Sequence, residues 1–169
     1  MVKASLLKTA AFLVPLAGLL YYGITEDLYR PVEIGEKAPH FSLPTIAGRP
    51  LEPSQFEGRV VVLNFWATWC PPCVAEMPSI AKLHKEMGDQ VAFVMLSFDL
   101  DFEKAKAFNK RKKYDLPVYA PAADLPDIYN SSDLPTTYII DASGNLVLTH
   151  KGMADYSDPE FRQFLNSLN

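Results

Sequence analysis

The chain has 169 residues, of which 49% are hydrophobic and 21% are charged, and its formal net charge is −4. This length and apolar content predict one globular domain of ordinary size with a real core, rather than a disordered chain. The acidic balance excludes a basic surface that could track phosphate groups, so we expect no nucleic-acid partner.

An uncharged segment, TAAFLVPLAGLLYYGIT, occupies residues 9–25, with Lys3 and Lys8 before it and two acidic residues after it. Its 17 residues, or about 20 if the Lys8 side chain reaches the interface, are just enough to cross a hydrocarbon core of about 30 Å. The positive flank predicts that the N-terminus stays in the cytoplasm and that the remaining chain faces outward.

The chain is therefore predicted to have three parts: a signal-anchor transmembrane helix over residues 1–28, a linker over 29–36 and a domain over 37–169. A cleaved signal peptide is the main competing interpretation, although the bulky residues LLYY do not suit a cleavage site, which needs small side chains. A buried helix of the domain is a third interpretation, which Pro15 disfavours. We expect a single-pass protein of the bacterial inner (cytoplasmic) membrane, with its domain facing the periplasm or another extracytoplasmic space.

Within the domain, residues 40–59 are expected to form two short extended pieces with a turn at 47–48. Apolar runs rich in β-branched residues predict strands over 60–66, 90–98, 116–120, 136–141 and 146–152. Helical spacing and end signals predict helices from about Cys73 to Gly88, over 102–113, and from Pro159, capped by Asp158, onward. Strands that alternate with helices and end in a hairpin and a helix predict a three-layer α/β sandwich with a mixed sheet.

The two cysteines of the chain lie in the segment NFWATWCPPCVAEMP, separated by two prolines. In an oxidising compartment they would ordinarily form a structural disulfide, but a bridge across two residues removes little chain entropy. The spacing suits a reversible redox pair better. Cys70 lies where a strand meets a helix N-terminus, which favours a thiolate, and we expect its sulfur to be accessible. Cys73, one helical turn further, is expected to be shielded and to act as the resolving thiol.

Three nearby residues have open interpretations from spacing alone. Glu76 shares a helix face with Cys73 and could take its proton, or it could be an ordinary solvated acid. Asn64 is polar within an apolar strand and must be hydrogen-bonded if it is buried; it could serve a proton path or be purely structural. Pro135 begins a strand, where an X-Pro bond is usually trans.

The segments VVVLNFWATWCPPCVAEMP (60–78) and LPTTYIID (134–141) resemble the thioredoxin superfamily. More narrowly, they resemble the membrane-anchored TlpA/ResA/CcmG group of extracytoplasmic thiol–disulfide oxidoreductases, and GEKAPHFSLPTIAGRPL (35–51) resembles the N-terminal extension of that group. The resemblance implies a thioredoxin-like three-layer α/β/α sandwich with a mixed central sheet and an N-terminal extension.

The resemblance also implies roles for individual residues. It makes Cys70 the attacking thiol, Cys73 the resolving thiol, Glu76 an acidic residue that handles a proton, and Pro135 a cis-proline that faces the disulfide. It implies substrate contacts at three further positions: Trp69, Leu134 and Thr136. Thioredoxins carry a buried aspartate where this chain has Asn64, so their usual proton relay is not expected here.

The implied function is reduction of protein disulfides through a mixed-disulfide intermediate. The implied partners are an exported protein with a disulfide, for example oxidised apocytochrome c, and a membrane electron donor of the thiol-reductant type. We expect a monomer without a cofactor or a bound metal.

Three different functions are also compatible with a close cysteine pair. The same exchange chemistry could run backwards as disulfide insertion. A copper-binding module could use both thiolates, with His150 as a candidate third ligand. A thiol peroxidase is disfavoured because Ala67, not threonine, lies three residues before Cys70.

Overall fold

The computed structural model describes residues 38, 53–121, 125, 129 and 133–168. All of them belong to the second of the two units into which the chain divides, residues 31–169. The predicted anchor, the linker and nearly all of the predicted N-terminal extension lie outside the described residues. Within the described part of the chain, no helix combines the length and the apolar character needed to cross a membrane.

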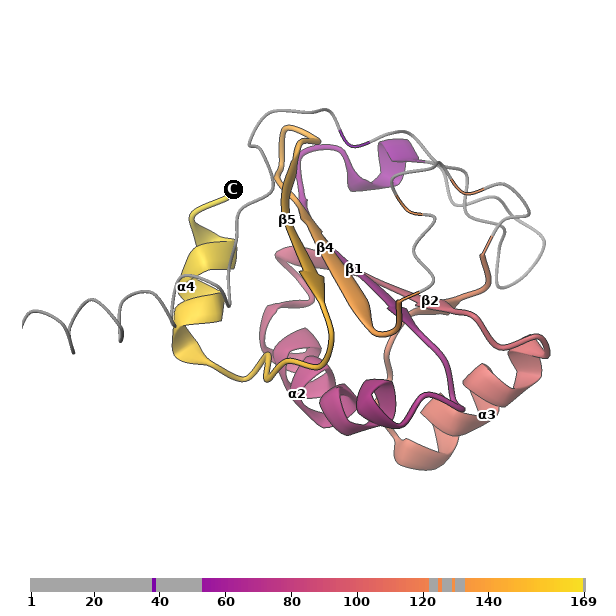
Figure 1. Cartoon of the computed structure of the whole chain (residues 1–169). Coiled ribbons are helices and arrows are strands. Elements are labelled where there is room, and N and C mark those ends of the chain that lie inside the picture. Colours follow the sequence, from indigo (N-terminus) through magenta and orange to yellow (C-terminus); the bar gives the residue numbers. More distant parts are fainter. Residues whose placement is uncertain (1–37, 39–52, 122–124, 126–128, 130–132, 169) are drawn as a thin grey trace, which may run out of the picture. The chain divides into compact units, whose positions relative to one another are not determined.

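Five strands form one mixed sheet within the described residues, in the order β3-β2-β1-β4-β5 (Figure 1). Their bounds are Val60–Trp66 (β1), Val91–Ser97 (β2), Val118–Tyr119 (β3), Thr136–Ile140 (β4) and Leu146–Lys151 (β5). Strands β1, β2 and β3 run parallel, whereas β4 is antiparallel to β1 and β5 is antiparallel to β4. Every residue of β1 and β2 is buried, as expected for central strands covered on both faces. The five predicted strands and the mixed sheet are confirmed, and only β3 is much shorter than predicted.

Three α-helices accompany the sheet in the described part of the chain: Pro71–Met87 (α2), Phe102–Lys112 (α3) and Pro159–Asn166 (α4). Helix α2 begins two residues earlier than predicted, because Cys70 acts as its N-cap and the two prolines fill its first positions. The prediction of extended chain up to residue 59 is wrong at Pro53–Phe56, which forms a 3-10 helix (η1). Proline fixes a φ that suits such a turn.

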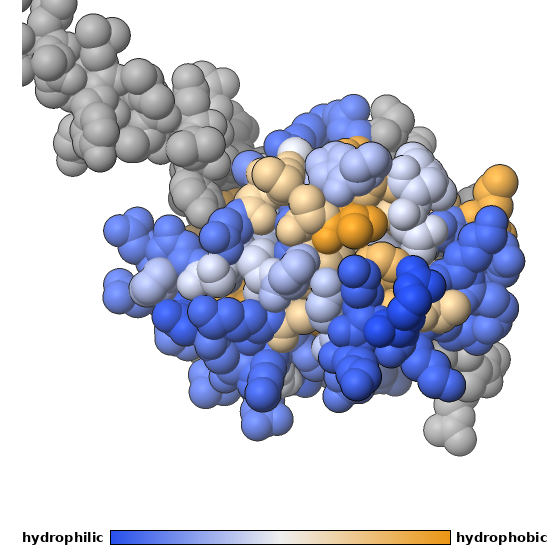
Figure 2. Space-filling view, turned by 90° about the horizontal axis from the view of Figure 1, so that it is seen from below, coloured by the Kyte–Doolittle hydropathy of each residue, from blue (hydrophilic) through white to orange (hydrophobic). Residues whose placement is uncertain are grey.

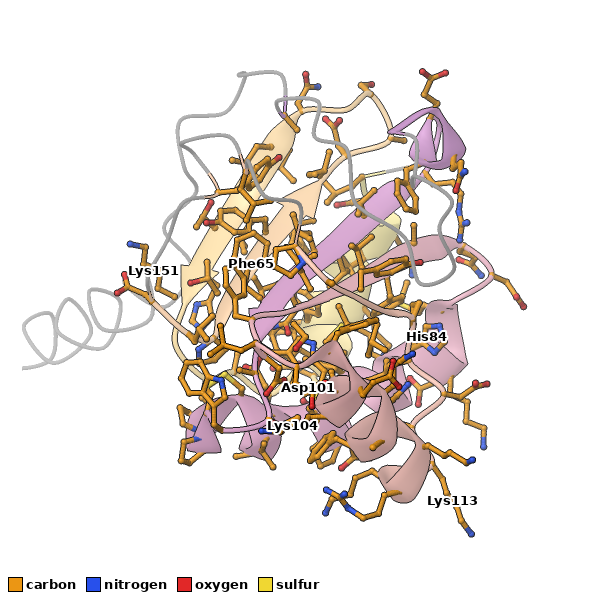
Figure 3. All side chains as sticks on the ribbon, turned by 90° about the vertical axis from the view of Figure 1, so that its right-hand side faces the viewer. Phe65, His84, Asp101, Lys104, Lys113 and Lys151 are labelled. Atoms are coloured by element: carbon orange, nitrogen blue, oxygen red, sulfur yellow. A yellow bond between two sulfur atoms is a disulfide. The ribbon has the colours of Figure 1, made fainter. Side chains whose placement is uncertain are left out.

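The helix ends follow the expected capping chemistry. The Asp101 side chain accepts the N–H of Glu103, and the Asp158 side chain accepts the N–H of Glu160. Helix α3 ends at Lys113 in the left-handed conformation, with φ 57°, so that Asp101 and Lys113 mark its two ends (Figure 3). Gly88 ends α2 as predicted, and a Cβ at this position would lie 2.7 Å from the carbonyl oxygen of His84.

The sheet separates two apolar clusters. The first combines buried side chains of α2, α3 and α4 with Val60, Val62 and the fully buried Trp66. The second, on the opposite face, contains a group of packed rings: Phe65, Tyr129 and Tyr138. The described residues thus form an α/β fold with a mixed five-stranded sheet, and the second helical layer of the predicted sandwich stays a prediction.

Candidate active site

The two cysteines form a disulfide at the junction between β1 and α2, and their Cα atoms are 5.3 Å apart. The Sγ atom of Cys70 accepts the backbone N–H of Cys73 over 3.3 Å. A helix N-terminus normally offers several free backbone N–H groups, but Pro71 and Pro72 have none. The N–H of Cys73 is therefore the donor that the first turn offers to the Cys70 sulfur. The local electrostatics favour negative charge on the Cys70 sulfur, as the sequence predicted, but through a single backbone donor.

The exposure of the two cysteines differs from the expectation in one respect. Cys70 is 4% exposed and Cys73 is 0% exposed, so Cys73 is shielded as predicted, whereas the expectation of an openly accessible Cys70 is wrong for the disulfide form. The bond to a fully buried partner holds the Cys70 sulfur against the first turn of α2. The neighbouring Trp69, in contrast, is 64% exposed.

Glu76 is a buried acid, not a solvated one, because it is only 2% exposed. Its Oε1 accepts a hydrogen bond from Nδ2 of Asn64 over 2.8 Å, and its Oε2 accepts the backbone N–H of Ala154 over 3.2 Å. Burial raises the pKa of Glu76 from 4.5 to about 7, against the lowering effect of these two hydrogen bonds. A carboxyl group with such a pKa can both accept and release a proton near neutral pH.

The peptide bond between Leu134 and Pro135 is cis. The family resemblance implied this conformation, whereas the position at a strand start alone favoured trans. The Pro135 carbonyl accepts the N–H of Gly152 over 2.8 Å. Thr136 pairs with Phe65 across the sheet, so β4 begins beside the end of β1, from which the chain runs on to Cys70. The sheet therefore brings the cis-proline and the cysteine pair to the same end of its strands.

The other two predicted substrate-contacting residues flank this proline. Leu134 is half-buried and packs on the core, and Thr136 is buried. The hydroxyl group of Thr136 donates to the carbonyl oxygen of Asp133 over 2.7 Å. The hydroxyl group of Thr136 is therefore engaged within the protein.

Asp99 holds the loop that precedes Cys70, a role that the sequence did not suggest. Its carboxylate accepts the N–H of Thr68 over 3.0 Å, the Thr68 hydroxyl over 2.6 Å and the Ser97 hydroxyl over 2.7 Å. The motif carries no local signal for this bond, because Thr68 and Asp99 are 31 residues apart.

We expect Asp99→Ala to lower the free energy of unfolding by about 3 kcal/mol, because it leaves a partly buried N–H and two hydroxyl groups without their acceptor. Chemical denaturation of the oxidised protein measures this loss. Asp101→Ala, which removes only a helix N-cap, is the matched control, with an expected loss of about 1 kcal/mol. Equal losses in the two variants would show that the bonds from Asp99 to Thr68 and Ser97 do not hold the loop.

The histidines do not assemble a metal site in the part of the chain that the structure describes. No group of three or more His, Cys, Asp or Glu side chains suited to a metal ion occurs among the described residues. His84 meets the edge of the Phe93 ring, and burial lowers its pKa. His150 lies on β5 opposite Thr137, and His40 lies outside the described residues.

Apolar side chains stand on the surface near the cysteine pair and Glu76. Figure 2 looks at the molecule from below in the orientation of Figure 1 and shows apolar side chains gathered near the middle of that face, with hydrophilic ones around them. Among the described residues, three large apolar side chains are exposed: Trp69, Leu100 and Met153. Each directly neighbours a residue of the site in the sequence, namely Cys70, Asp99 or Ala154.

Together, fold and site define a class of protein: a thioredoxin-like domain that carries out thiol–disulfide exchange through a close cysteine pair. Comparison with known proteins agrees. Residues 34–149 match the AhpC/TSA family, and the chain belongs to this family. The chain is 36% identical over 124 residues to the thioredoxin-like protein YneN of Bacillus subtilis, covering 72% of this chain and 73% of YneN. It is 32% identical over 161 residues to the thiol-disulfide oxidoreductase ResA of Bacillus cereus, covering 90% and 91% of the two chains.

A solved structure supports the same assignment. The thiol:disulfide interchange protein of the thioredoxin family from Chlorobium tepidum has a TM-score of 0.68 and 28% identity, with coverage of 82% of this chain and 97% of that chain. The resemblance to the TlpA/ResA/CcmG group and the assignment as an oxidoreductase enzyme are therefore confirmed.

Proposed function

We propose that this protein reduces disulfides of exported proteins, with Cys70 as the attacking thiol and Cys73 as the resolving thiol. The observation that carries this assignment is the asymmetry of the pair. Cys70 caps the helix and receives a backbone N–H on its sulfur, while Cys73 is fully covered. The capped sulfur is the better thiolate and the one with any access to a large substrate.

The proposed reaction consists of two exchanges. The Cys70 thiolate attacks one sulfur of the substrate disulfide, forms a mixed disulfide and releases the other substrate sulfur as a thiolate. Cys73, once deprotonated, then attacks the Cys70 sulfur, re-forms the Cys70–Cys73 bond and releases the second substrate sulfur. Two electrons pass to the substrate, which becomes a dithiol, and a thiol reductant must restore the enzyme.

Glu76 is proposed as the group that takes the proton from Cys73. The two residues lie one helical turn apart on α2, and the carboxyl group is buried with a pKa of about 7. A base with this pKa is close to ideal for a proton transfer at neutral pH.

The substrate is proposed to lie across the surface around Trp69, Leu134 and Thr136, where an extended segment could pair with the chain ahead of β4. The exposed ring of Trp69 supports this surface. A surface hollow of about 480 Å³, lined in part by Pro78, Met153 and Ala154, adjoins the loop that covers Glu76.

The location and partners belong to the same proposal. The uncharged segment 9–25 supports an anchor in the inner membrane that holds a monomeric domain outside the cytoplasm, near a thiol-reducing membrane donor. Oxidised cysteines of an apocytochrome c are the proposed type of substrate. Membrane fractionation of the full chain and of a chain without residues 1–28 tests the anchor, and recovery of both in the soluble fraction would contradict it.

The direction of the reaction is tested by the reduction potential of the Cys70–Cys73 pair, measured by equilibration with a dithiol buffer. A reductase is expected near the value of thioredoxin, about −270 mV, whereas a value near −120 mV would mark a disulfide-inserting oxidant instead. Hydrogen peroxide consumption with a thiol donor is the control for a peroxidase. A peroxidase gains no support from Thr68, whose hydroxyl group donates to Asp99.

A further inference from the structure

A chain of hydrogen bonds leads away from Glu76 into the core. Nδ2 of Asn64 donates to Oε1 of Glu76 over 2.8 Å and also to Oγ1 of Thr137 over 2.9 Å. Oγ1 of Thr137 lies 2.6 Å from the hydroxyl oxygen of Tyr156, and either of these two groups can be the donor. All four side chains are at most 4% exposed. The carboxyl group is thus linked to three buried polar side chains, none of which is charged.

The sheet itself fixes this arrangement. Asn64 on β1 pairs directly with Thr137 on β4, which pairs directly with His150 on β5. Directly paired residues point to the same face of a sheet, so these side chains form one polar row on the face that also receives Glu76. Among the described residues, the titratable groups that share this row or the helix face of Glu76 include Cys73 on its own helix, Tyr156 ahead of α4 and His150 at the far end of the row.

Only the nitrogen end of the Asn64 side-chain amide has hydrogen-bond partners among the described residues. Its nitrogen has two acceptors, whereas its oxygen is fully buried and has no hydrogen-bond partner among the described residues. This arrangement suits an ionised Glu76, which only accepts hydrogen bonds. A protonated Glu76 must instead donate its O–H, and the unpartnered Oδ1 of the same amide is an acceptor that can receive this O–H once the amide turns.

We propose that Asn64 is a positioning residue whose side-chain amide flips, so that Oδ1 and Nδ2 exchange places, when Glu76 changes its protonation state. With the carboxylate, both N–H bonds of Asn64 donate, to Glu76 and Thr137, and the Thr137 hydroxyl donates to Tyr156. With the carboxylic acid, Glu76 and Thr137 both donate to Oδ1 of Asn64, and Tyr156 donates to Thr137. The hydrogen bonds from Asn64 to Tyr156 can reverse their direction without transfer of a proton among these three residues, because only the amide and the two hydroxyl groups rotate.

This inference rests on the proposed function, in which Glu76 gains and releases one proton in each catalytic cycle. A fixed hydrogen-bond donor would stabilise only the carboxylate and would oppose proton uptake. An amide that can present either end keeps Glu76 in one place in both states, so that the carboxyl group stays within reach of Cys73.

The test is nuclear magnetic resonance of the oxidised protein, in which the cysteines do not titrate. The carbon shift of the Glu76 carboxyl group reports its protonation, and through-space contacts from the Asn64 side-chain N–H protons report the orientation of the amide. We expect contacts from these protons to the hydroxyl-bearing side chain of Thr137 at pH 9 and their loss at pH 5. Contacts that persist while Glu76 is protonated would overturn the inference.

Two variants complete the test. Glu76→Gln is uncharged at every pH, and its single oxygen is needed to accept the backbone N–H of Ala154. Its NH2 group then faces Asn64, so the Asn64 amide is expected to stay in the carboxylic-acid-type orientation throughout. Asn64→Leu is expected to slow turnover about tenfold at pH 7, whereas Met95→Leu, at the paired position on β2, should leave it unchanged. Equal turnover of Asn64→Leu and the parent would contradict the inference. If Glu76→Gln itself leaves turnover unchanged, it is the proposed role of Glu76 that fails.

Discussion

Cys70→Ser is expected to abolish reduction of a protein disulfide, with a fall in rate of more than about 1,000-fold, because it removes the only nucleophile that the mechanism uses in its first step. A hydroxyl group at this position is not ionised near neutral pH and cannot form the mixed disulfide. The rate is measured as thiol release from an oxidised protein substrate in the presence of a dithiol reductant.

Cys73→Ser is the matched variant, because it keeps the attacking sulfur and removes only the resolving one. It should form the mixed disulfide with the substrate and hold it, so that a covalent adduct through Cys70 accumulates. Mass spectrometry of non-reduced samples detects the adduct and its attachment site. If the adduct accumulates in Cys70→Ser and not in Cys73→Ser, the two roles are reversed.

Glu76→Gln is expected to change the pH dependence of both stability and activity. In the folded protein the pKa of Glu76 is about 7, whereas the ordinary value is 4.5. Between these two pH values the folded state holds a proton that the unfolded state has lost, so the free energy of unfolding falls as the pH rises. The total loss is on the order of 3 kcal/mol. It should be absent in Glu76→Gln, as measured by denaturation at pH 4.5 and pH 8.

The same substitution removes the proposed proton acceptor. The resolving step should then be slower by about 100-fold, and its increase with pH through about 7 should disappear, because that increase follows ionisation of Glu76. Single-turnover measurements of mixed-disulfide decay give this step directly. Glu86→Gln, an exposed acid of the same helix that pairs with Arg162, is the control. A pH step that survives in Glu76→Gln would assign it to another group.

The sulfur substitutions and the Glu76 substitution probe two different properties of the site. The sulfur substitutions test which atoms exchange electrons, whereas the Glu76 substitution tests how the protons are managed. The oxidised structure already separates the two, because the disulfide lies at the helix start and the carboxyl group lies one turn deeper, against Asn64 and the loop at Ala154.

Local features of the sequence were sufficient for much of this fold. The run 60–66 is a strand over its whole predicted length, and Asp158 caps the last helix as predicted. Such signals are local: strand character, capping and helix termination depend on residues within a few positions of one another. The cysteine pair is local in the same sense, so its place at a helix start could also be predicted.

The sequence by itself thus determined the order of the elements, the redox pair and the helix on which it lies. Only the tertiary structure decided the environment of Glu76, because its partner Asn64 is 12 residues away and Ala154 is 78 residues away. It also decided the function of Asp99 and the link between Asn64 and Thr137, which are 73 residues apart. The physical reason is that burial and hydrogen bonding between distant segments arise only when the sheet brings those segments together, and no local pattern encodes them.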